Sequence, residues 1–301
     1  MMHVKLFGST AVVTEDGAVA VTDLGGVKPR QILEILALSA GSPVPKDRLA
    51  ELLWEGAPPK SYVGTLESYV CVLRRRLGQG RGRRSALATT SNGYLLDPTM
   101  VGVDLTEFRA LAAAALTASP ADAVELSQQA LALVTGDLLA TEAYADWADH
   151  ERALVRREVV TACTRAAGWA LQVGDVDLAL TMGRRAVQMD PIAEAAWRYM
   201  MQTLQASGRR GEALRAYAEL REAMTSELGM EPGAESRALY LELLQDETAA
   251  APGTGNEHME VSTLLGLLRQ ALEAIPGIDV PPVDDPLAEI AVRWLRVNAA
   301  A

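Results

Sequence analysis

The fold is decided by residues 60–97, KSYVGTLESYVCVLRRRLGQGRGRRSALATTSNGYLLD. Apolar residues recur there at alternating steps of three and four, which places one apolar stripe along a helix from about Lys60 to Leu77. The stripe consists of Val63, Leu66, Val70, Leu73 and Leu77. A loop rich in glycine and arginine follows, and then two short strand-like runs, ALATT and YLLD, flank an Asn-Gly turn. The stretch therefore predicts a helix followed by a two-stranded hairpin.

The residues before this stretch predict a small sheet and two more helices. Alternating apolar and β-branched residues predict three short strands, at 3–7, 11–14 and 18–22. The run RQILEILALSAG then predicts a helix that ends at Gly41, and a second short helix is expected from Pro45 to Trp54. Three helices followed by a two-stranded ribbon are the order of a winged helix-turn-helix domain.

The face of the third helix opposite the apolar stripe suits contact with DNA. Small hydrogen-bonding residues occupy its middle and cations lie near its end, which allows close approach to base edges and neutralisation of phosphates. The alternative is a solvated face whose cationic last turn complements the helix macrodipole. With the basic loop and the hairpin included, the candidate DNA-binding residues are Lys60, Ser61, Thr65, Ser68, Tyr69, Val72, Arg74, Arg75, Arg76, Arg81, Arg83, Arg84, Thr90 and Tyr94.

Charge is divided unevenly along the chain. The net charge of −11 argues by itself against binding to nucleic acid. Residues 1–97, however, hold twelve Lys and Arg against nine Asp and Glu, a net +3, which leaves −14 for residues 98–301. Within 60–84 the net charge is +6. Because phosphate attraction is local and screened within about 10 Å, this basic segment matters more than the average.

Cysteine usage and hydropathy indicate a cytoplasmic protein. The two cysteines, Cys71 and Cys163, do not have the spacing of a metal site or a redox pair, so we expect a reducing compartment. The first residues do not resemble a signal peptide, and no apolar run has the length of a membrane span.

The motifs of several kinds of site are missing. The histidines have no metal-binding partner at helical spacing, and the glycine-rich loop lacks the lysine of a phosphate-binding loop. The acidic cluster of Asp146, Asp149 and Glu151 has no companion nucleophile and is interpreted as a solvated helix face. We therefore expect no catalytic residue, no cofactor, no metal and no enzyme activity.

The second part of the chain predicts a run of helices that contains a repeat. Asp104 and Ser119 have surroundings typical of helix N-caps. The segment GDVDLAL, which begins at Gly174, is echoed 34 residues later by GRRGEAL, which begins at Gly208. This is the tetratricopeptide period, in which glycine occupies the turn between helices and alanine their closest contact. Such all-α domains bind peptides, partner subunits or their own chain.

Motifs in both parts resemble one known family. The runs LRRRL at 73–77 and GY at 93–94 resemble those of OmpR-type winged-helix domains, in which four strands precede the first helix. The run ELGMEPG at 227–233, followed by RALY at 237–240, resembles the end of the bacterial transcriptional activation domain. A chain with both is similar to the Streptomyces antibiotic regulatory proteins.

This resemblance implies a transcriptional activator of antibiotic or other secondary-metabolite genes. Such a protein binds tandem direct repeats in double-stranded promoter DNA, is expected to form a homodimer there, and recruits RNA polymerase and its sigma factor. It would be associated with the nucleoid and not with a membrane. Two alternatives stay open: a tetratricopeptide adaptor whose N-terminal module contacts protein, and a repressor with the same DNA-binding fold.

The predicted fold class is mainly α with a small β component. We expect an OmpR-type winged-helix domain, a tetratricopeptide-like domain, a linker and a helical tail at 1–98, 104–247, 248–258 and 259–301. The tail contains two amphipathic patterns, Glu260 to Ile275 and Leu287 to Val297. Because so short a segment cannot hold a core alone, we expect it to pack on the body or on another protomer.

Overall fold

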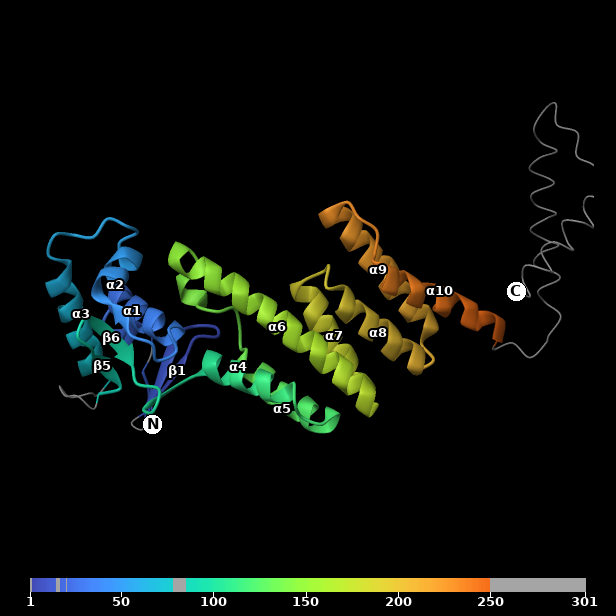
Figure 1. Cartoon of the computed structure of the whole chain (residues 1–301), viewed down its shortest axis with the longest axis horizontal. Helices are drawn as coiled ribbons and strands as arrows, with labels where there is room; N and C mark the ends of the chain where they lie inside the picture. Colours follow the sequence, from blue (N-terminus) through green and yellow to red (C-terminus); the bar gives the residue numbers. More distant parts are fainter. Residues whose placement is uncertain (1, 15–16, 20, 78–84, 250–301) are drawn as a thin grey trace, which may run out of the picture. The chain divides into compact units, whose positions relative to one another are not determined.

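A computed structural model describes residues 2–14, 17–19, 21–77 and 85–249 of the chain (Figure 1). The described residues up to Leu244 pack as one compact unit. Outside the described residues lie three candidate arginines and the predicted tail: Arg81, Arg83, Arg84 and 259–301. No helix of the described part is long and apolar enough to cross a membrane.

A four-stranded sheet opens the chain, in the order β3-β2-β1-β7. Its strands are β1 (Met2–Lys5), β2 (Ala11–Thr14), β3 (Gly17–Val19) and β7 (Val101–Val103). The three predicted strands are confirmed, although the last is shorter than predicted because a 3-10 turn, η1 (Val21–Leu24), follows it.

The fourth strand of this sheet does not precede the first helix, contrary to the expectation from the OmpR resemblance. It is β7, which lies after the hairpin and pairs with β1 in parallel, with Val4 opposite Val103. A parallel pairing needs a long crossover, and here three helices and the hairpin supply it.

Three helices and a second, three-stranded sheet complete the predicted winged helix. The helices are α1 (Val27–Leu38), α2 (Lys46–Leu53) and α3 (Tyr62–Arg76), which confirms all three predicted helices to within a few residues. The second sheet has the order β4-β6-β5, formed by β4 (Val44–Pro45), β6 (Gly93–Leu96) and β5 (Leu87–Thr89). Gly93 pairs so closely with β4 that a Cβ there would collide with the carbonyl oxygen of Val44.

The apolar stripe of α3 faces the core as predicted, with one exception. Leu66, Val70, Leu73 and Leu77 are all at most 4% exposed. Val63 is 40% exposed, so its assignment to the stripe is wrong. It lies in the first turn of the helix, one turn before the residues that the core covers.

Helices form the rest of the described chain. They are α4 (Asp104–Ala115), α5 (Pro120–Leu133), the short η2 (Ala140–Glu142), α6 (Asp146–Val173), α7 (Val176–Met189), α8 (Glu194–Ala206), α9 (Arg210–Leu228) and α10 (Ala234–Ala249). Figure 1 shows them as successive antiparallel pairs. The first two residues of the predicted linker, 248 and 249, belong to α10.

The predicted repeat is confirmed as the pairs α6–α7 and α8–α9. Gly174 and Gly208 lie between the helices of each pair in the left-handed region, with φ of 79° and 70°. Ala179 and Ala213, at equivalent positions, are fully buried where the helices pack. The fold is therefore mainly helical, a winged helix followed by a tetratricopeptide-like domain.

Only one of the two predicted N-caps is confirmed. The Ser119 hydroxyl accepts a hydrogen bond from the backbone N–H of Asp122, and Pro120 follows it in the first turn of α5. Asp104 is instead the first residue of α4, after Val103 as N-cap. Its carboxylate accepts hydrogen bonds from a distant part of the chain.

Candidate nucleic-acid interface

The outer face of α3 presents short polar side chains. Ser61 and Ser68 are exposed and Thr65 is half-exposed. The Thr65 and Ser68 hydroxyls donate to the carbonyl oxygens of Ser61 (3.2 Å) and Gly64 (2.9 Å) of the same helix. Since a hydroxyl oxygen has two lone pairs, both side chains can still accept a hydrogen bond from an outside donor.

Cations flank this face at both ends. Lys60 lies just before α3, and Arg75 and Arg76 are exposed in its last turn. Within the described part of the chain, neither arginine side chain has a hydrogen-bond or ion-pair partner. Their guanidinium groups are therefore available to a phosphate or a guanine, the groups that arginine binds in bidentate fashion.

Arg74 connects α3 to the hairpin instead of facing outward. Its Nε and Nη2 atoms donate to the carbonyl oxygen of Leu87 (3.0 and 2.8 Å), and Nη2 also donates to the Thr89 hydroxyl (2.7 Å). Its donors are thus largely occupied by β5. We therefore reassign Arg74 from DNA contact to the positioning of α3 against the hairpin.

Tyr94 is buried, at 2% exposure, which corrects its prediction as a DNA contact. Burial raises the pKa of its phenol above the usual value, so the ring stays neutral. The ammonium of Lys46 lies 5.7 Å from the ring centroid and donates to Glu67 of α3 (2.7 Å). Lys46, the first residue of α2, was not among the candidates, although a cation at the start of the helix before α3 is visible in the sequence.

Three further candidates for DNA contact are partly covered by other parts of the chain: Val72, Tyr69 and Thr90. A Cβ on Gly25, at φ of 95°, would collide with the Val72 side chain, so the segment after η1 lies over this part of α3. Tyr69 is half-buried and packs against the core. Thr90 lies in the hairpin turn, where its N–H donates to the carbonyl oxygen of Gly93 (2.9 Å). Val72 is thus partly covered by this segment.

Asp104 connects the segment directly after β1 to the start of α4. One or both of its carboxylate oxygens accept from the backbone N–H groups of Leu6 (2.9 Å), Phe7 (3.0 Å) and Leu105 (2.8 Å). The side chain is buried, and desolvation raises its pKa above the usual value. The hydrogen bonds act in the opposite direction but are outweighed. The carboxylate thus fastens two distant segments together.

A buried polar cluster forms a second connection, between α1 and η2. Glu142 accepts hydrogen bonds from Arg30 Nε (2.9 Å) and Gln31 Nε2 (2.8 Å). The neighbouring Glu34 is fully buried and accepts from the Thr10 hydroxyl (2.5 Å). Burial raises the pKa of Glu34 to about 7. Nothing in the sequence pattern pointed to Glu142, since its partners lie more than 100 residues away.

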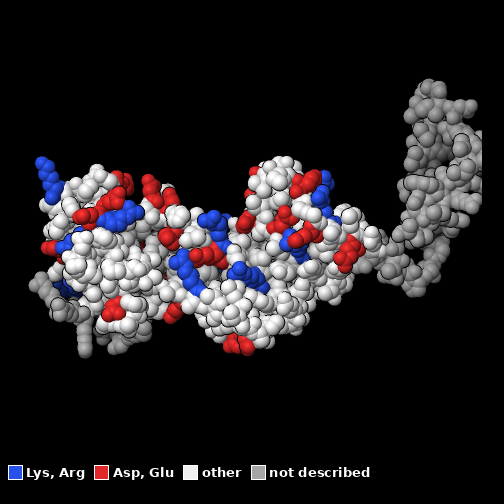
Figure 2. All heavy atoms as spheres, in the orientation of Figure 1, with Lys and Arg blue, Asp and Glu red and all other residues white. Residues whose placement is uncertain are grey.

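Charges of both signs lie on the helical part of the chain. Figure 2 shows Lys and Arg interspersed with Asp and Glu on the face in view, with several groups of each. Some are paired, as in Arg109 with Glu158 (2.9 Å), Arg209 with Glu212 (2.7 Å) and Arg221 with Glu231 (2.8 Å). Mixed charge of this kind lacks the single-sign positive field that attracts the phosphate backbone.

Two family models match the chain, and their order repeats the order of its folded parts. Residues 25–96 match the model of the transcriptional regulatory protein C terminal, and residues 103–244 match the model of the bacterial transcriptional activator domain. An outward-facing third helix in a winged helix, followed by a tetratricopeptide-like domain, therefore defines this class of protein as a transcriptional regulator.

Known relatives identify the family. The chain is 30% identical over 279 residues to regulatory protein DnrI of Streptomyces peucetius, covering 86% of this chain and 97% of that protein. It is 31% identical over 229 residues to transcriptional regulatory protein MoaR1 of Mycobacterium tuberculosis, covering 74% and 73%. The chain belongs to the Streptomyces antibiotic regulatory protein family.

A solved structure shares the fold. The structure of Mycobacterium tuberculosis EmbR in complex with a low-affinity phosphopeptide superposes with a TM-score of 0.72 at 24% identity, over 91% of this chain and 72% of EmbR. At that identity the likeness concerns the arrangement of the helices and strands and carries no information on ligands.

Proposed function

We propose that this chain is a DNA-binding transcriptional activator of a secondary-metabolite pathway, and that α3 enters the major groove. The observation that carries this proposal is the outer face of α3, where exposed Ser68 and half-exposed Thr65 precede the unpartnered, exposed Arg75 among the described residues. The anchoring of Arg74 to β5 supports it, because α3 and the hairpin then meet DNA as one rigid surface.

The parts of the chain divide this work. We propose a DNA-binding domain at 1–98, an activation domain at 104–247, a linker at 248–258 and a tail of unassigned role at 259–301. In this proposal a homodimer binds tandem promoter repeats in the cytoplasm, at the nucleoid. The activation domain contacts RNA polymerase and its sigma factor. The relatives' names as regulatory proteins and the mixed charges of the helical part support this division.

Replacement of Arg75 by alanine tests the DNA interface. If Arg75 pairs with a guanine, Arg75→Ala should weaken binding to the specific site by about 1–3 kcal/mol and relax the preference at one base position. A gel-shift titration against the upstream region and its single-base variants measures both. Arg184→Ala, which removes an equal charge from the exposed face of α7, is the control and should bind normally. Unchanged affinity and base preference for Arg75→Ala would remove α3 from the interface.

Activation should separate from DNA binding at the helical domain. Glu219 and Glu222 are exposed on α9, whereas Arg209 and Arg210 are engaged by Glu212 and by the carbonyl oxygen of Leu243. Glu219→Gln with Glu222→Gln should therefore leave promoter affinity unchanged and lower transcription several-fold. Run-off transcription beside a gel shift on the same variant measures the two effects.

A scan of exposed charges extends this test to the rest of the domain. If activation tracks DNA affinity at every exposed position, the helical domain does not contact polymerase, and the proposed mechanism is wrong.

A further inference from the structure

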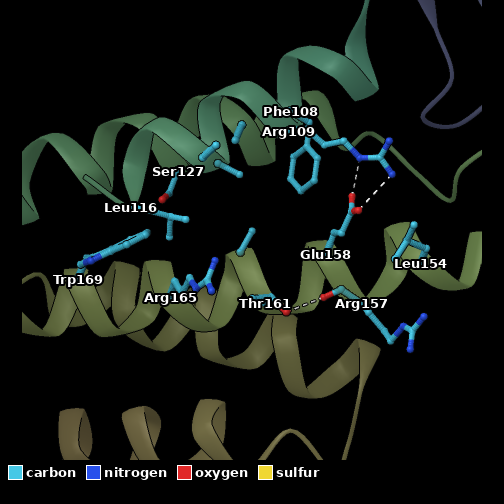
Figure 3. Close-up of a pocket in the computed structure, with 14 residues that line it drawn as sticks. Phe108, Arg109, Leu116, Ser127, Leu154, Arg157, Glu158, Thr161, Arg165 and Trp169 are labelled. Atoms are coloured by element: carbon cyan, nitrogen blue, oxygen red, sulfur yellow. Dashed lines mark hydrogen bonds and ion pairs between the residues drawn. The ribbon is translucent and has the colours of Figure 1, made fainter. Parts of the chain in front are cut away.

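A cavity of about 360 Å³ lies between α4, α5 and α6 (Figure 3). Its walls are mainly apolar and are formed by Phe108, Ala112, Leu116, Ala130, Ala162 and Trp169. Small-molecule sites in proteins occupy roughly 300–1,000 Å³ and combine apolar walls with a few polar groups. The cavity is therefore large enough for a molecule of two or three fused or linked rings.

The two ends of the cavity differ in chemistry. At one end Arg109 donates to both carboxylate oxygens of Glu158 (2.9 and 3.1 Å; Figure 3) and lies 3.6 Å from a carboxylate oxygen of Glu151, so its charge is already paired. At the other end the indole of Trp169 lies below Leu116, which is 51% exposed (Figure 3). A ligand would thus meet an apolar, aromatic surface at the Trp169 end.

Three polar side chains that line the cavity have no partner among the described residues: those of Ser127, Arg157 and Arg165. The Arg157 side chain points away from the cavity (Figure 3). Ser127 of α5 is only 3% exposed, and its hydroxyl faces the space between the helices (Figure 3). Arg165 of α6 is exposed and lies between Thr161 and Trp169 at the rim (Figure 3). A hydroxyl that faces a cavity can bond a polar atom of a ligand, and a guanidinium without a counterion attracts anions.

Helix periodicity places the cation beside the aromatic ring. Thr161, Arg165 and Trp169 follow one another at steps of four, so all three lie on one face of α6. A ligand with an apolar body in the cavity would therefore carry its anionic group within reach of Arg165. A neutral ligand would gain no charge-assisted hydrogen bond from this arginine, and a cationic ligand would be repelled by it.

We propose that this cavity binds a small amphipathic organic anion, with an aromatic or alicyclic body between α4, α5 and α6 and a carboxylate, sulfonate or phosphate at Arg165. The Ser127 hydroxyl would bond a polar atom of the body. The limited volume of the cavity and the cation at Arg165 favour a compact organic anion over an extended peptide segment. This site goes beyond the proposed DNA-binding and activating function and does not depend on it.

Two dyes with the same carbon skeleton test the proposal on the full chain. 1-Anilinonaphthalene-8-sulfonate carries the anionic group, and N-phenyl-1-naphthylamine lacks it. Both fluoresce strongly in apolar surroundings. We expect saturable binding of both at one site per chain, with the sulfonate binding more tightly. Arg165→Gln should weaken binding of the sulfonate about tenfold and leave binding of the neutral dye unchanged, because a charge-assisted hydrogen bond contributes about that much.

Two further variants control for charge and location. Arg184→Gln removes an equal charge away from the cavity and should change neither dye's affinity. Thr161→Trp should abolish binding of both dyes, because Thr161 lines the cavity and the larger indole would occupy its space. The variant should fold, because Thr161 is exposed and its hydroxyl bonds only to the carbonyl oxygen of Arg157 in its own helix. Circular dichroism checks that each variant is folded.

Three outcomes would overturn the proposal. One is that neither dye binds saturably at one site per chain. Another is an equal loss of sulfonate affinity in Arg165→Gln and Arg184→Gln, which would show general attraction to a charged surface. The third is dye binding that survives in a folded Thr161→Trp variant, which would place the dyes elsewhere. If Thr161→Trp does not fold, the comparison of the two dyes on Arg165→Gln still decides.

Discussion

Replacement of Asp104 by alanine should lower the free energy of unfolding by about 3–5 kcal/mol, since each buried amide left without an acceptor costs about 1–3 kcal/mol. The Asp104 carboxylate is 3% exposed and is the acceptor for the backbone N–H groups of Leu6, Phe7 and Leu105. Alanine would leave these donors buried without a partner. It would also separate β1 of the winged helix from the start of α4.

Urea unfolding followed by circular dichroism measures the loss, with Asp146→Ala as the matched control. Asp146 also lies in the first turn of a helix, α6, but it is exposed. Its removal should cost only the interaction with the helix dipole, about 0.3–1 kcal/mol. An Asp104→Ala variant no less stable than Asp146→Ala would show that Asp104 merely complements the dipole of α4, as a sequence motif for a helix start implies.

Local patterns predicted the elements of this fold because short-range spacing determines them. The period of α3 gave its buried residues Leu66, Val70 and Leu73, and the 34-residue period gave the turns at Gly174 and Gly208. Contacts between distant segments were not accessible in this way. The pairing of β7 with β1 joins residues about a hundred positions apart, and no periodicity within either strand encodes it.

The candidate interface shows the same limit. Helical periodicity indicated which residues lie opposite the core, but it could not show what else covers them. Gly25 of another segment lies against Val72, and β5 accepts the hydrogen bonds of Arg74. Tyr94 pairs with Val44 of β4 and is 2% exposed. The exposed residues of α3 stay candidates for DNA contact. The surroundings of Val72, Arg74 and Tyr94 depend on tertiary contacts, which the sequence pattern does not show.

The free energy of unfolding should depend strongly on pH, because Glu34 is a fully buried carboxyl with one unpartnered oxygen among the described residues. Its Oε2 atom has no hydrogen-bond partner in the described part of the chain. Desolvation is the main cause that raises its pKa from 4.5 to about 7, and Glu142 raises it further. The Thr10 hydroxyl and Arg30 act in the opposite direction and are outweighed.

The sign of the pH dependence follows from these values. Below pH 4.5 Glu34 is protonated in both the folded and the unfolded chain, so its contribution to stability is fully present. Between pH 4.5 and about 7 the unfolded chain ionises first, and the folded chain loses stability as pH rises. The total loss is roughly 3 kcal/mol, since each pKa unit corresponds to about 1.4 kcal/mol. Above the folded pKa no further loss arises from this group.

Glu34→Gln, which mimics the protonated acid, should therefore be more stable than the parent chain at pH 8 by roughly 2–3 kcal/mol and nearly equal to it at pH 4.5. Urea unfolding of both chains at half-unit steps from pH 4.5 to 8 measures the difference, in which the titration of groups that do not interact with Glu34 cancels. Glu125→Gln, on the exposed face of α5, controls for the loss of one carboxylate. A stability difference that stays constant over this range, or a parent chain that is the more stable at pH 8, would mean that Glu34 remains ionised and that Arg30 outweighs its desolvation.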